Sequence, residues 1–454
     1  MKLFVTILEE TPERAIEAIR SIDADHDGVE IRAERFTKYD IRALRATTTK
    51  PIIFTRRGLP FDENVMREAI EAGIDFVDVE YEGPLRAAAL HQRCVVLSHH
   101  DLNGMPDVET LVRQMSALGP AHVKIAVTPR NFADNERLLR LLTATTNHQP
   151  LTTIGLGERG LYSRILAPFR GSELVFVSRS DDRSAAPGQL SLHRALEIYG
   201  ERRDSLRADR VFAVVGNPAG HSLSPSIHNE LFRRKGVAAA YTIASIESFD
   251  EIVAPFLNGE PYGLSVTVPF KRDAYNFAQQ RGAATGENAR ECESVNTLVN
   301  GKPIVADNTD VDGFESILSQ ICGRDRKSVA IVGAGGTARA ALVAVRRAKM
   351  HVTVFNRTEE KGSELAARFG ARAEPLDALE RFDGEVIINT TTTDAEIPLL
   401  SRPGLTYVES AYGSPAVARR QATLRENGVQ VFDGWDLLQA QAVRQHELFM
   451  RALE

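Results

Sequence analysis

The chain has 454 residues, of which 43% are hydrophobic and 26% are charged, and its formal net charge is -6. This length predicts two or three domains, and the composition is ordinary for a globular protein. The small acidic excess gives no electrostatic reason to expect a nucleic acid partner.

The sequence also gives no sign of a membrane span or a disulfide framework. No apolar run is long enough to cross a bilayer, and the chain begins with a short apolar run followed by acids, which predicts a first strand and not a signal peptide. Cys94, Cys292 and Cys322 are odd in number and far apart, so neither disulfides nor a metal site is expected. The reducing cytoplasm is the expected location.

Short apolar runs typical of strands recur through the first 180 residues and alternate with helical patterns such as Glu13–Ile19, Glu63–Ala72 and Val108–Leu118. The predicted strands are Lys2–Leu8, Val29–Glu34, Pro51–Arg56, Phe76–Tyr81, Cys94–His99, His122–Val127, Leu151–Gly155 and Leu174–Ser178. Eight strands that alternate with helices predict a parallel (β/α)8 barrel, which we place at residues 1–206.

Lys124 lies in the middle of the predicted strand His122–Val127, among apolar neighbours. Burial of an unpaired ammonium costs several kcal/mol, roughly, so desolvation would favour the neutral amine, which is a nucleophile toward carbonyl groups. On this stretch alone, a lysine that reaches solvent from a half-exposed strand is an equal alternative.

Other polar residues stand at or after the ends of the predicted strands, where the active site of such a barrel lies. They are Glu30 and Arg32, Asp78 and Glu80, the run Ser98-His99-His100-Asp101, Arg164, and the run Ser184–Gln189. Each alone has a structural explanation, because barrels also bury ion pairs. Their joint placement at one end of eight strands favours an active site.

These motifs resemble type I 3-dehydroquinate dehydratase over nearly all of residues 1–205. The resemblance implies that Lys124 forms a Schiff base with the ring ketone, that His100 transfers protons, and that Glu80 orients His100. It further assigns substrate-binding roles to Glu30, Arg32, Arg164 and Gln189. One departure is that Ala185, preceded by Ser184, stands where the family usually has serine.

The charged stretch Arg202–Arg210 has neither strand nor helix periodicity and predicts a domain junction on which few contacts depend. Residues 1–207 are therefore expected to dehydrate 3-dehydroquinate when expressed alone. A new strand pattern begins at Val211–Gly216.

A glycine motif further on predicts a dinucleotide site. Val329–Ala340 contains Gly333, Gly335 and Ala338 in the pattern G-x-G-x-x-A, between a strand and a helix, and Ala334 and Gly336 complete the turn. The next predicted strand, His351–Phe355, ends in Asn356-Arg357-Thr358 instead of the acid that usually holds the ribose of NAD. Because arginine can pair with the extra phosphate, the sequence predicts NADP, bound by a Rossmann-type domain at residues 319–434.

Three polar clusters precede this motif. Ser222 and Ser224 stand in a loop before a helix, Thr267 and Lys271 end a strand, and Asp310 precedes a helix predicted around Gly313–Ile321. An aspartate in that position is usually a helix cap.

Together the clusters resemble shikimate dehydrogenase over residues 211–454. The resemblance implies that Lys271 and Asp310 form the catalytic pair, with the formal acid undecided between them. It assigns substrate binding to Ser222, Ser224, Thr267, Asn296, Tyr412 and Gln441, and cofactor binding to Asn356, Arg357, Thr358 and Gly434. The implied substrate domain is residues 209–318, to which a helix at residues 435–454 returns. Glu409 replaces the family's usual aspartate, and Val311 stands where glycine is common.

The two resemblances support each other, because the expected product of the barrel is the expected substrate of the dehydrogenase. We expect a bifunctional enzyme that converts 3-dehydroquinate to 3-dehydroshikimate and then, with NADPH, to shikimate. Small molecules are its expected partners, with neither nucleic acid nor membrane, and the oligomeric state is left open. One alternative is a quinate/shikimate dehydrogenase of broader specificity. Another is a ligand-sensing regulator of the same folds. Such a protein should have lost its catalytic residues, whereas Lys124, His100, Lys271 and Asp310 are all present.

Overall fold

The computed structural model describes residues 1–57, 63–83, 94–144, 149–201, 203, 206–321, 327–392 and 395–453. The chain forms two compact units, residues 1–214 with 218–252, and residues 215–217 with 253–454. Cys322 lies outside the described residues. Among the described helices, none combines the length and apolar character that a bilayer span requires.

The first unit contains a parallel sheet of eight strands in the order β7-β6-β5-β4-β3-β2-β1-β8, which confirms the predicted (β/α)8 architecture. The strands are β1 (Lys2–Ile7), β2 (Gly28–Arg32), β3 (Ile52–Thr55), β4 (Phe76–Glu80), β5 (Val95–Asp101), β6 (His122–Val127), β7 (Leu151–Gly155) and β8 (Leu174–Ser178). Strand β5 is longer than predicted and includes His100, whereas β2 ends at Arg32 because a turn of 3-10 helix follows at once.

A threonine hydroxyl helps to bring the two ends of this sheet together. The Thr152 hydroxyl in β7 accepts a hydrogen bond from the backbone N–H of Leu174 in β8 (3.1 Å), and the N–H of Glu173 donates to the carbonyl of Leu151 (3.4 Å). These bonds link β7 to β8, so the strands enclose a barrel interior.

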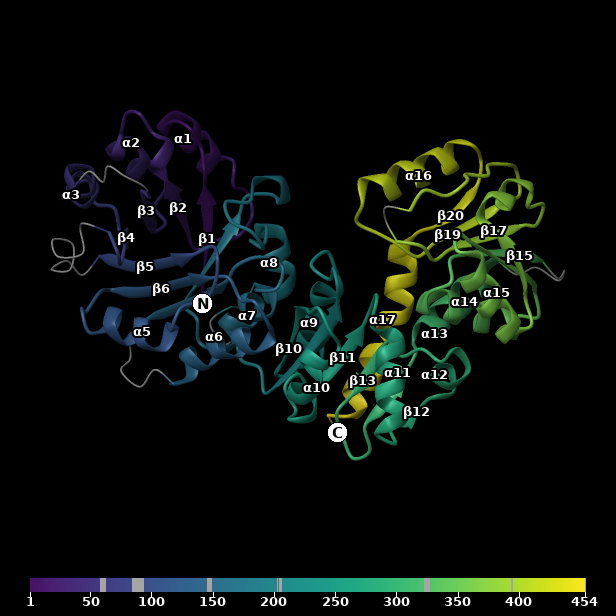
Figure 1. Cartoon of the computed structure of the whole chain (residues 1–454). Coiled ribbons are helices and arrows are strands. Elements are labelled where there is room, and N and C mark those ends of the chain that lie inside the picture. The colour runs from purple at the N-terminus through teal and green to yellow at the C-terminus, as the bar shows by residue number, and fades with distance from the viewer. Residues whose placement is uncertain are drawn as a thin grey trace. The chain divides into compact units, whose positions relative to one another are not determined.

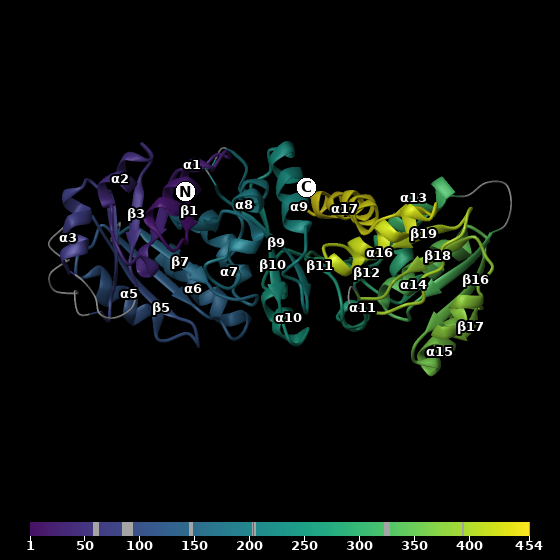
Figure 2. The same ribbon diagram turned by 90° about the horizontal axis from the view of Figure 1, so that it is seen from above.

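Helices lie on the outside of the barrel strands (Figures 1 and 2). They are α1 (Pro12–Arg20), α2 (Ile41–Ala46), α3 (Glu63–Glu71), α5 (Val108–Ser116), α6 (Phe132–Ala144), α7 (Leu161–Leu166) and α8 (Leu192–Tyr199), with 3-10 turns η1 (Ala33–Arg35), η2 (Ala167–Arg170) and η3 (Asp181–Arg183). Side chains cap several of them, as where Asp107 accepts from the backbone N–H of Thr110 at the start of α5.

A mixed sheet of six strands follows, in the order β10-β9-β11-β13-β14-β12. Its strands are β9 (Arg210–Gly216), β10 (Ala239–Ser245), β11 (Gly263–Val266), β12 (Ala284–Thr285), β13 (Thr297–Val299) and β14 (Val305–Asp307). The helices of this region are α9 (Ser224–Lys235), α10 (Asp250–Leu257), α11 (Lys271–Gln280), α12 (Glu287–Cys292) and α13 (Asp310–Ile321).

The third sheet is parallel, in the order β17-β16-β15-β18-β19-β20, which is the strand order of a Rossmann fold. Its strands are β15 (Ser328–Val332), β16 (His351–Asn356), β17 (Arg372–Pro375), β18 (Val386–Asn389), β19 (Thr406–Glu409) and β20 (Gln430–Phe432). Its helices are α14 (Gly336–Arg347), α15 (Glu359–Phe369), η4 (Leu376–Arg381) and α16 (Pro415–Glu426). The C-terminal helix α17 (Gly434–Arg451) follows β20 and packs against α13 and β13 of the preceding region.

Alternating side chains of β15 build one core on each face of this sheet. Val329 and Ile331 join the buried cluster of α13, α14 and α15, whereas Ala330 and Val332 join the cluster that contains Leu424 of α16. The apolar run of β15 is therefore buried on both faces, which fixes the glycine turn at its end.

The expectation of few contacts at the charged junction is wrong for Arg203. Its side chain is buried and pairs with Asp25 (2.8 Å) and Asp27 (3.1 Å), and its carbonyl accepts from the amino group of Met1. Such a run looks solvated in the sequence because its acidic partners are distant in the chain. Residues 202, 204 and 205 lie outside the described part.

Candidate active sites

Lys124 lies inside the barrel and is 2% exposed. Its Nζ donates to Glu30 Oε1 (3.2 Å) and Asp78 Oδ2 (3.0 Å) and stands 3.9 Å from the centre of the Phe176 ring. The expectation of an unpaired charge is thus wrong, because carboxylates from β2 and β4 flank the lysine. The geometry thus holds a potential nucleophile in a fixed position inside the barrel.

Both flanking carboxylates are held in their charged form. Burial alone would raise the pKa of Glu30, but the positive charge of Lys124, with smaller effects of nearby arginines, lowers it to about 2. Burial would also raise the pKa of Asp78, but the positive charges of Lys124 and Arg57 hold it well below its ordinary value. Hydroxyl groups of Thr6 (2.9 Å) and Thr55 (3.1 Å) also donate to Glu30.

His100 lies on β5, next to the strand that carries Lys124, and Ser98 two residues earlier is in register with Lys124. Its Nδ1 lies 2.8 Å from Glu80 Oε2, and its Nε2 lies 2.6 Å from Arg57 Nη2. Since a guanidinium only donates, Nε2 accepts and the ring proton resides on Nδ1. Burial lowers the pKa of His100, as does Arg57, against the opposing effect of Glu80. The imidazole is therefore a neutral base at neutral pH.

The predicted substrate-binding residues of the barrel have different surroundings. Arg32 pairs with Glu34 (2.5 Å). Arg164 is buried, and its guanidinium donates to the carbonyls of Pro187 (3.2 Å) and Phe176 (3.4 Å). Burial lowers the pKa of Arg164 to about 10. Across the described part of the chain, no acid lies within ion-pair distance of this guanidinium, which suits an anionic ligand.

Gln189 ties the last loop of the barrel to its first strand. Its Nε2 donates to the Thr6 hydroxyl (3.1 Å), and its Oε1 accepts from the N–H of Ala185 (2.7 Å). The Ser184 hydroxyl is exposed and donates to the carbonyl of Ala186. Ala185 thus contributes its backbone, and not a hydroxyl, to this loop.

Sequence reasoning missed Arg57 as a functional residue. The only signal was the pair Arg56-Arg57 directly after the third strand, and arginines there are usually solvated. Asp78 was noted as a polar strand residue, but its role as a partner of Lys124 and of the Ser98 hydroxyl (2.6 Å) follows from the barrel geometry.

The second half holds a compact network around Lys271 and Asp310. Lys271 Nζ donates to Asp310 Oδ2 (2.5 Å) and to the Thr337 hydroxyl (3.1 Å), and Asn296 Nδ2 donates to Asp310 Oδ1 (2.9 Å). Asp310 is the first residue of α13 and its carboxylate engages these side chains, so it does not act as a simple helix cap. All of these polar groups except Thr337 are buried.

The C-terminal helix α17 completes this network. Gln441 accepts from the Thr309 hydroxyl (3.0 Å), and Gln445 donates to the Thr297 hydroxyl (2.8 Å) and accepts from Ser265 (2.5 Å). Gln445 was not predicted, because a glutamine on a helix is usually exposed. The other predicted substrate residue of this unit, Thr267, follows β11 and its N–H donates to the Val215 carbonyl.

Ser222 and Ser224 are buried at the start of α9, in the first compact unit. The N–H of Ser224 donates to the Ser222 hydroxyl (3.3 Å). Tyr412 lies in the second unit, after β19, where the fully buried Glu409 pairs with Arg420 (2.7 Å) and accepts from the N–H of Ala411 (3.1 Å). The binding of one substrate by residues of both units stays a prediction.

The glycine turn at the end of β15 has three glycines with three different surroundings. Gly333 has φ +111°, which favours glycine, and a Cβ there would meet the Thr390 hydroxyl at 2.7 Å. A Cβ on Gly336 would lie 3.0 Å from Lys271 Cβ, so this glycine lets α14 approach the catalytic lysine. A Cβ on Gly335 would meet no atom within 4 Å, which leaves that side of the helix N-terminus open to a phosphate.

The end of β16 also fits a dinucleotide with an extra phosphate. Arg357 and Thr358 are exposed directly after the strand, and Asn356 Nδ2 donates to the carbonyl of Thr358 (2.7 Å). Gly434 begins α17, and a Cβ there would collide with the carbonyl of Ala411 at 2.3 Å. Sequence reasoning missed Thr337, in the first turn of α14. Its hydroxyl accepts a hydrogen bond from Lys271 and so links the glycine turn after β15 to the catalytic lysine.

Three families match successive parts of the chain. Residues 3–205 match the family described as type I 3-dehydroquinase. Residues 214–298 match the shikimate dehydrogenase substrate binding domain, and residues 316–414 match shikimate / quinate 5-dehydrogenase.

Two curated relatives combine these parts in one chain. The bifunctional 3-dehydroquinate dehydratase/shikimate dehydrogenase, chloroplastic, of Arabidopsis thaliana is 28% identical over 486 residues, which cover 96% of this chain and 79% of that protein. The shikimate biosynthesis protein AroDE of Chlamydia pneumoniae is 30% identical, over 78% of this chain and 73% of that protein.

Solved structures of shikimate dehydrogenases are similar to the second half. Shikimate 5-dehydrogenase from Thermus thermophilus, in complex with NADP(H) and shikimate, is 25% identical and has a TM-score of 0.46. The similarity covers 53% of this chain and 94% of that one.

Proposed function

The chain belongs to the family of bifunctional 3-dehydroquinate dehydratases/shikimate dehydrogenases, and we propose that its barrel dehydrates 3-dehydroquinate through Lys124 while its second half reduces the product with NADPH. The two halves catalyse consecutive steps of the shikimate pathway, a lyase reaction followed by an oxidoreductase reaction. The observation that supports the first step is the buried Lys124 on β6, because the adjacent strand β5 carries His100 as a neutral base.

The dehydration needs a nucleophile and a group that moves one proton. The deprotonated amine of Lys124 attacks the ring ketone and a C–N bond forms. The ketone oxygen then leaves as water, with one proton from the amine and one from solvent. The resulting iminium withdraws electrons, so the adjacent C–H proton can pass to Nε2 of His100. His100 then gives this proton to the leaving hydroxyl group, and water hydrolyses the iminium.

Neighbouring residues prepare His100 for this role. Glu80 accepts from Nδ1 and stabilises the imidazolium that forms when Nε2 takes the proton. The hydrogen bond from Arg57 to Nε2 has to break before the transfer, so substrate must displace that guanidinium. Arg164 is the proposed partner of the substrate carboxylate, with Glu30, Arg32 and Gln189 as further contacts.

In the second half, Lys271 and Asp310 are the proposed catalytic pair. When bound, NADPH supplies a hydride to the ketone carbon of 3-dehydroshikimate. The Lys271–Asp310 pair delivers a proton to the oxygen that becomes the alcohol. Ser222 and Ser224 are proposed to bind the carboxylate, and Thr267, Asn296, Tyr412 and Gln441 to surround the ring.

The glycine turn and Arg357 are the reason to propose NADP as cofactor. Gly333, Ala334, Gly335 and Gly336 surround the open N-terminus of α14, where a pyrophosphate fits. Arg357, with Asn356 and Thr358, is proposed to hold the 2′-phosphate, and Gly434 to contribute to cofactor binding. We keep the cytoplasm as the proposed location, since Cys94 and Cys292 are both free thiols.

The direct test gives the purified protein 3-dehydroquinate and NADPH and follows shikimate formation and NADPH loss. The Lys124→Met variant should no longer dehydrate 3-dehydroquinate but should still reduce added 3-dehydroshikimate. The Lys271→Met variant should still dehydrate 3-dehydroquinate but should no longer reduce 3-dehydroshikimate. Failure of wild type to form shikimate would refute the proposal.

A quinate/shikimate dehydrogenase remains the second candidate for the second half, because the matching family description names both substrates. Oxidation of quinate and of shikimate with NADP⁺ should be compared by kcat/KM. We expect shikimate to be preferred, and a preference for quinate would favour the second candidate.

A further inference from the structure

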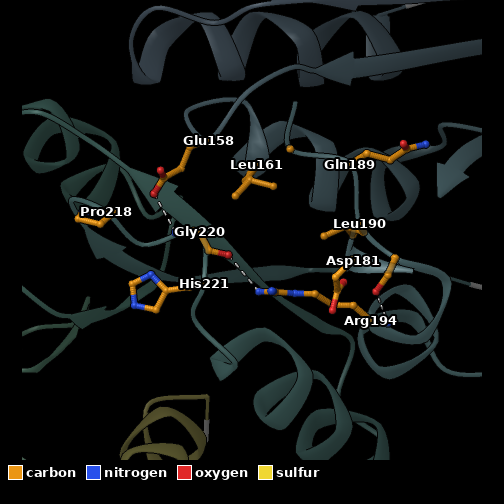
Figure 3. A pocket seen from close by; sticks show the side chains of 11 residues that line it. Glu158, Leu161, Asp181, Gln189, Leu190, Arg194, Pro218, Gly220 and His221 are labelled. Carbon is orange, nitrogen blue, oxygen red and sulfur yellow. Dashed lines mark hydrogen bonds between the residues drawn. The ribbon is translucent and has the colours of Figure 1, made fainter. Parts of the chain in front are cut away.

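The predicted carboxylate-binding serines stand in a loop that the barrel holds from two sides. This segment, residues 218–224, is called the serine loop here; it lies between β9 and the first residue of α9, Ser224, and belongs to the same compact unit as the barrel. Glu158, after β7, and Arg194, in α8, both bond to its backbone (Figure 3). The support for a dehydrogenase substrate loop therefore comes from the dehydratase.

Glu158 binds two successive N–H groups of the serine loop. Its Oε1 accepts from Ala219 (2.7 Å) and Gly220 (2.8 Å), and also from the Ser245 hydroxyl (3.0 Å). Partial burial opposes the charge, but the two backbone N–H groups lower the pKa of Glu158. Hydrogen bonds to a charged acceptor are about twice as strong as neutral ones, so the carboxylate holds the backbone of the serine loop strongly.

Arg194 holds the carbonyl groups of the same loop. Its Nη2 donates to Gly220 (3.2 Å) and to Ser222 (2.6 Å), so the guanidinium binds the backbone of a proposed carboxylate-binding residue itself. Within the loop, the N–H of Ser222 donates to the Ala219 carbonyl (3.0 Å). Because the backbone is bonded on both of its edges, the position of the Ser222 hydroxyl depends on both barrel residues.

The same barrel segment also supports the dehydratase loop. The N–H of Gly157 donates to the Pro187 carbonyl (3.0 Å), and a Cβ on Gly188 would lie 2.6 Å from the Gly157 carbonyl oxygen. A cavity of about 350 Å³ is lined by residues of both loops, among them Gln189 and His221 (Figure 3). The β7–α7 loop thus contacts one substrate loop of each activity.

We propose that Glu158 and Arg194 are positioning residues for the dehydrogenase, through which the barrel holds the serine loop in its substrate-binding conformation. This inference rests on the proposed function, because it takes Ser222 as a ligand of the substrate carboxylate. Glu158 and Arg194 are proposed to act through the backbone of this loop, to which both side chains bond. The barrel is accordingly part of the dehydrogenase machinery and not only a fused partner.

The test measures both activities of the full-length chain for Glu158→Ala and Arg194→Met. Loss of a charge-assisted bond to the loop should raise KM for shikimate about tenfold in either variant. The KM for NADP⁺ and kcat/KM for 3-dehydroquinate should stay near wild type, since neither residue belongs to those sites. A general folding defect would instead lower kcat of both activities together and would not raise the KM for shikimate alone.

Matched controls remove the same side-chain types elsewhere on the barrel. Glu71→Ala, at the end of α3, and Arg113→Met, in α5, delete exposed charges that are remote in sequence from the serine loop. Both should leave every parameter unchanged. Glu158→Gln keeps one oxygen acceptor and should recover part of the lost shikimate affinity.

A double variant decides whether the effect passes through Ser222. If Glu158 acts by placing that residue, Glu158→Ala should add little to the KM increase of Ser222→Ala. Fully additive effects, or an unchanged KM in Glu158→Ala and Arg194→Met, would overturn the inference. If wild type itself failed to oxidise shikimate, the proposed function would fall instead, so the two failures are distinguishable.

Discussion

Lys124 shows how two buried carboxylates can hold a nucleophile in position for attack. Glu30 and Asp78 hold the amine at 3.2 and 3.0 Å in an otherwise apolar interior. We predict that borohydride with 3-dehydroquinate adds a stable mass to the peptide that carries Lys124, because reduction traps the C–N bond. Mass spectrometry of the digested protein is the measurement.

The matched control is Lys124→Met, which should take up no label. Any other labelled lysine, or the absence of label from active wild type, would remove Lys124 as the nucleophile. Glu30→Gln should keep the label but form it more slowly, since one charge that orients the amine is lost.

The pH dependence of dehydration should report on His100. Burial lowers the pKa of this imidazole, and Glu80 acts in the opposite direction by stabilising the charged form. Replacement Glu80→Gln removes that stabilisation, so the pKa should fall further and the acid limb of kcat/KM should move to lower pH. Loss of one charge-assisted hydrogen bond of about 1.5–3 kcal/mol should reduce kcat roughly tenfold to a hundredfold.

Glu82→Gln is the control for this experiment, because Glu82 lies near His99 (3.3 Å) on an exposed stretch and has no bond to His100. Its profile should match wild type. An acid limb that stays in place in Glu80→Gln would mean that another group governs the proton transfer.

Arg357 should decide cofactor choice. It is exposed directly after β16, where this fold reads the adenine ribose, and its guanidinium can bind phosphate with two donors. Arg357→Ala should lower kcat/KM for NADPH by roughly tenfold to a hundredfold and leave the value for NADH little changed. Arg381→Ala, an exposed arginine of the same sheet region, is the control. Equal losses for both cofactors would reopen NAD as the natural one.

At the scale of elements, two adjacent glycines of the turn between β15 and α14, Gly335 and Gly336, have different roles. Gly335 has open space where a Cβ would lie, whereas a Cβ on Gly336 would lie 2.9 Å from the Ser294 hydroxyl and 3.0 Å from Lys271 Cβ. We predict that Gly335→Ala raises KM for NADPH with little change in thermal stability. Gly336→Ala should instead lower kcat of the dehydrogenase, because α14 must move away from Lys271. Steady-state kinetics and melting curves distinguish the two, and identical behaviour would refute this division.

The strands and this turn could be predicted because their signals are local. Apolar runs, the glycine spacing and the polar residues at strand ends are all visible in a short window of sequence. The partners of Lys124 were not predictable in this way, since Glu30 and Asp78 meet it only when β2, β4 and β6 close into a barrel. Arg57 and Arg203 were missed for the same reason, as each finds its partner on a distant segment.

At the scale of the whole molecule, the first compact unit continues beyond the charged junction and includes residues 218–252 as well as the barrel. Helix α7 packs against β10, and α8 packs against α9. The buried Thr242 hydroxyl bonds to the Tyr162 carbonyl (3.1 Å), and Arg233 bonds to the carbonyl of Glu197 (2.7 Å). Residues after the junction therefore cover helices that precede it.

This packing sets the expected behaviour of residues 1–207 expressed alone. All proposed dehydratase residues lie before the cut, so the folded fragment should keep the dehydratase kcat/KM of the full chain. Removal of α9 and β10 uncovers α7 and α8, and a loss of about 3 kcal/mol would lower Tm by roughly 6–12 °C. A longer fragment, residues 1–252, retains both elements and should recover most of that loss. Equal Tm values of the two fragments would show that α9 and β10 do not stabilise the barrel. A short fragment that is folded but inactive would show that the dehydratase site needs residues beyond the junction.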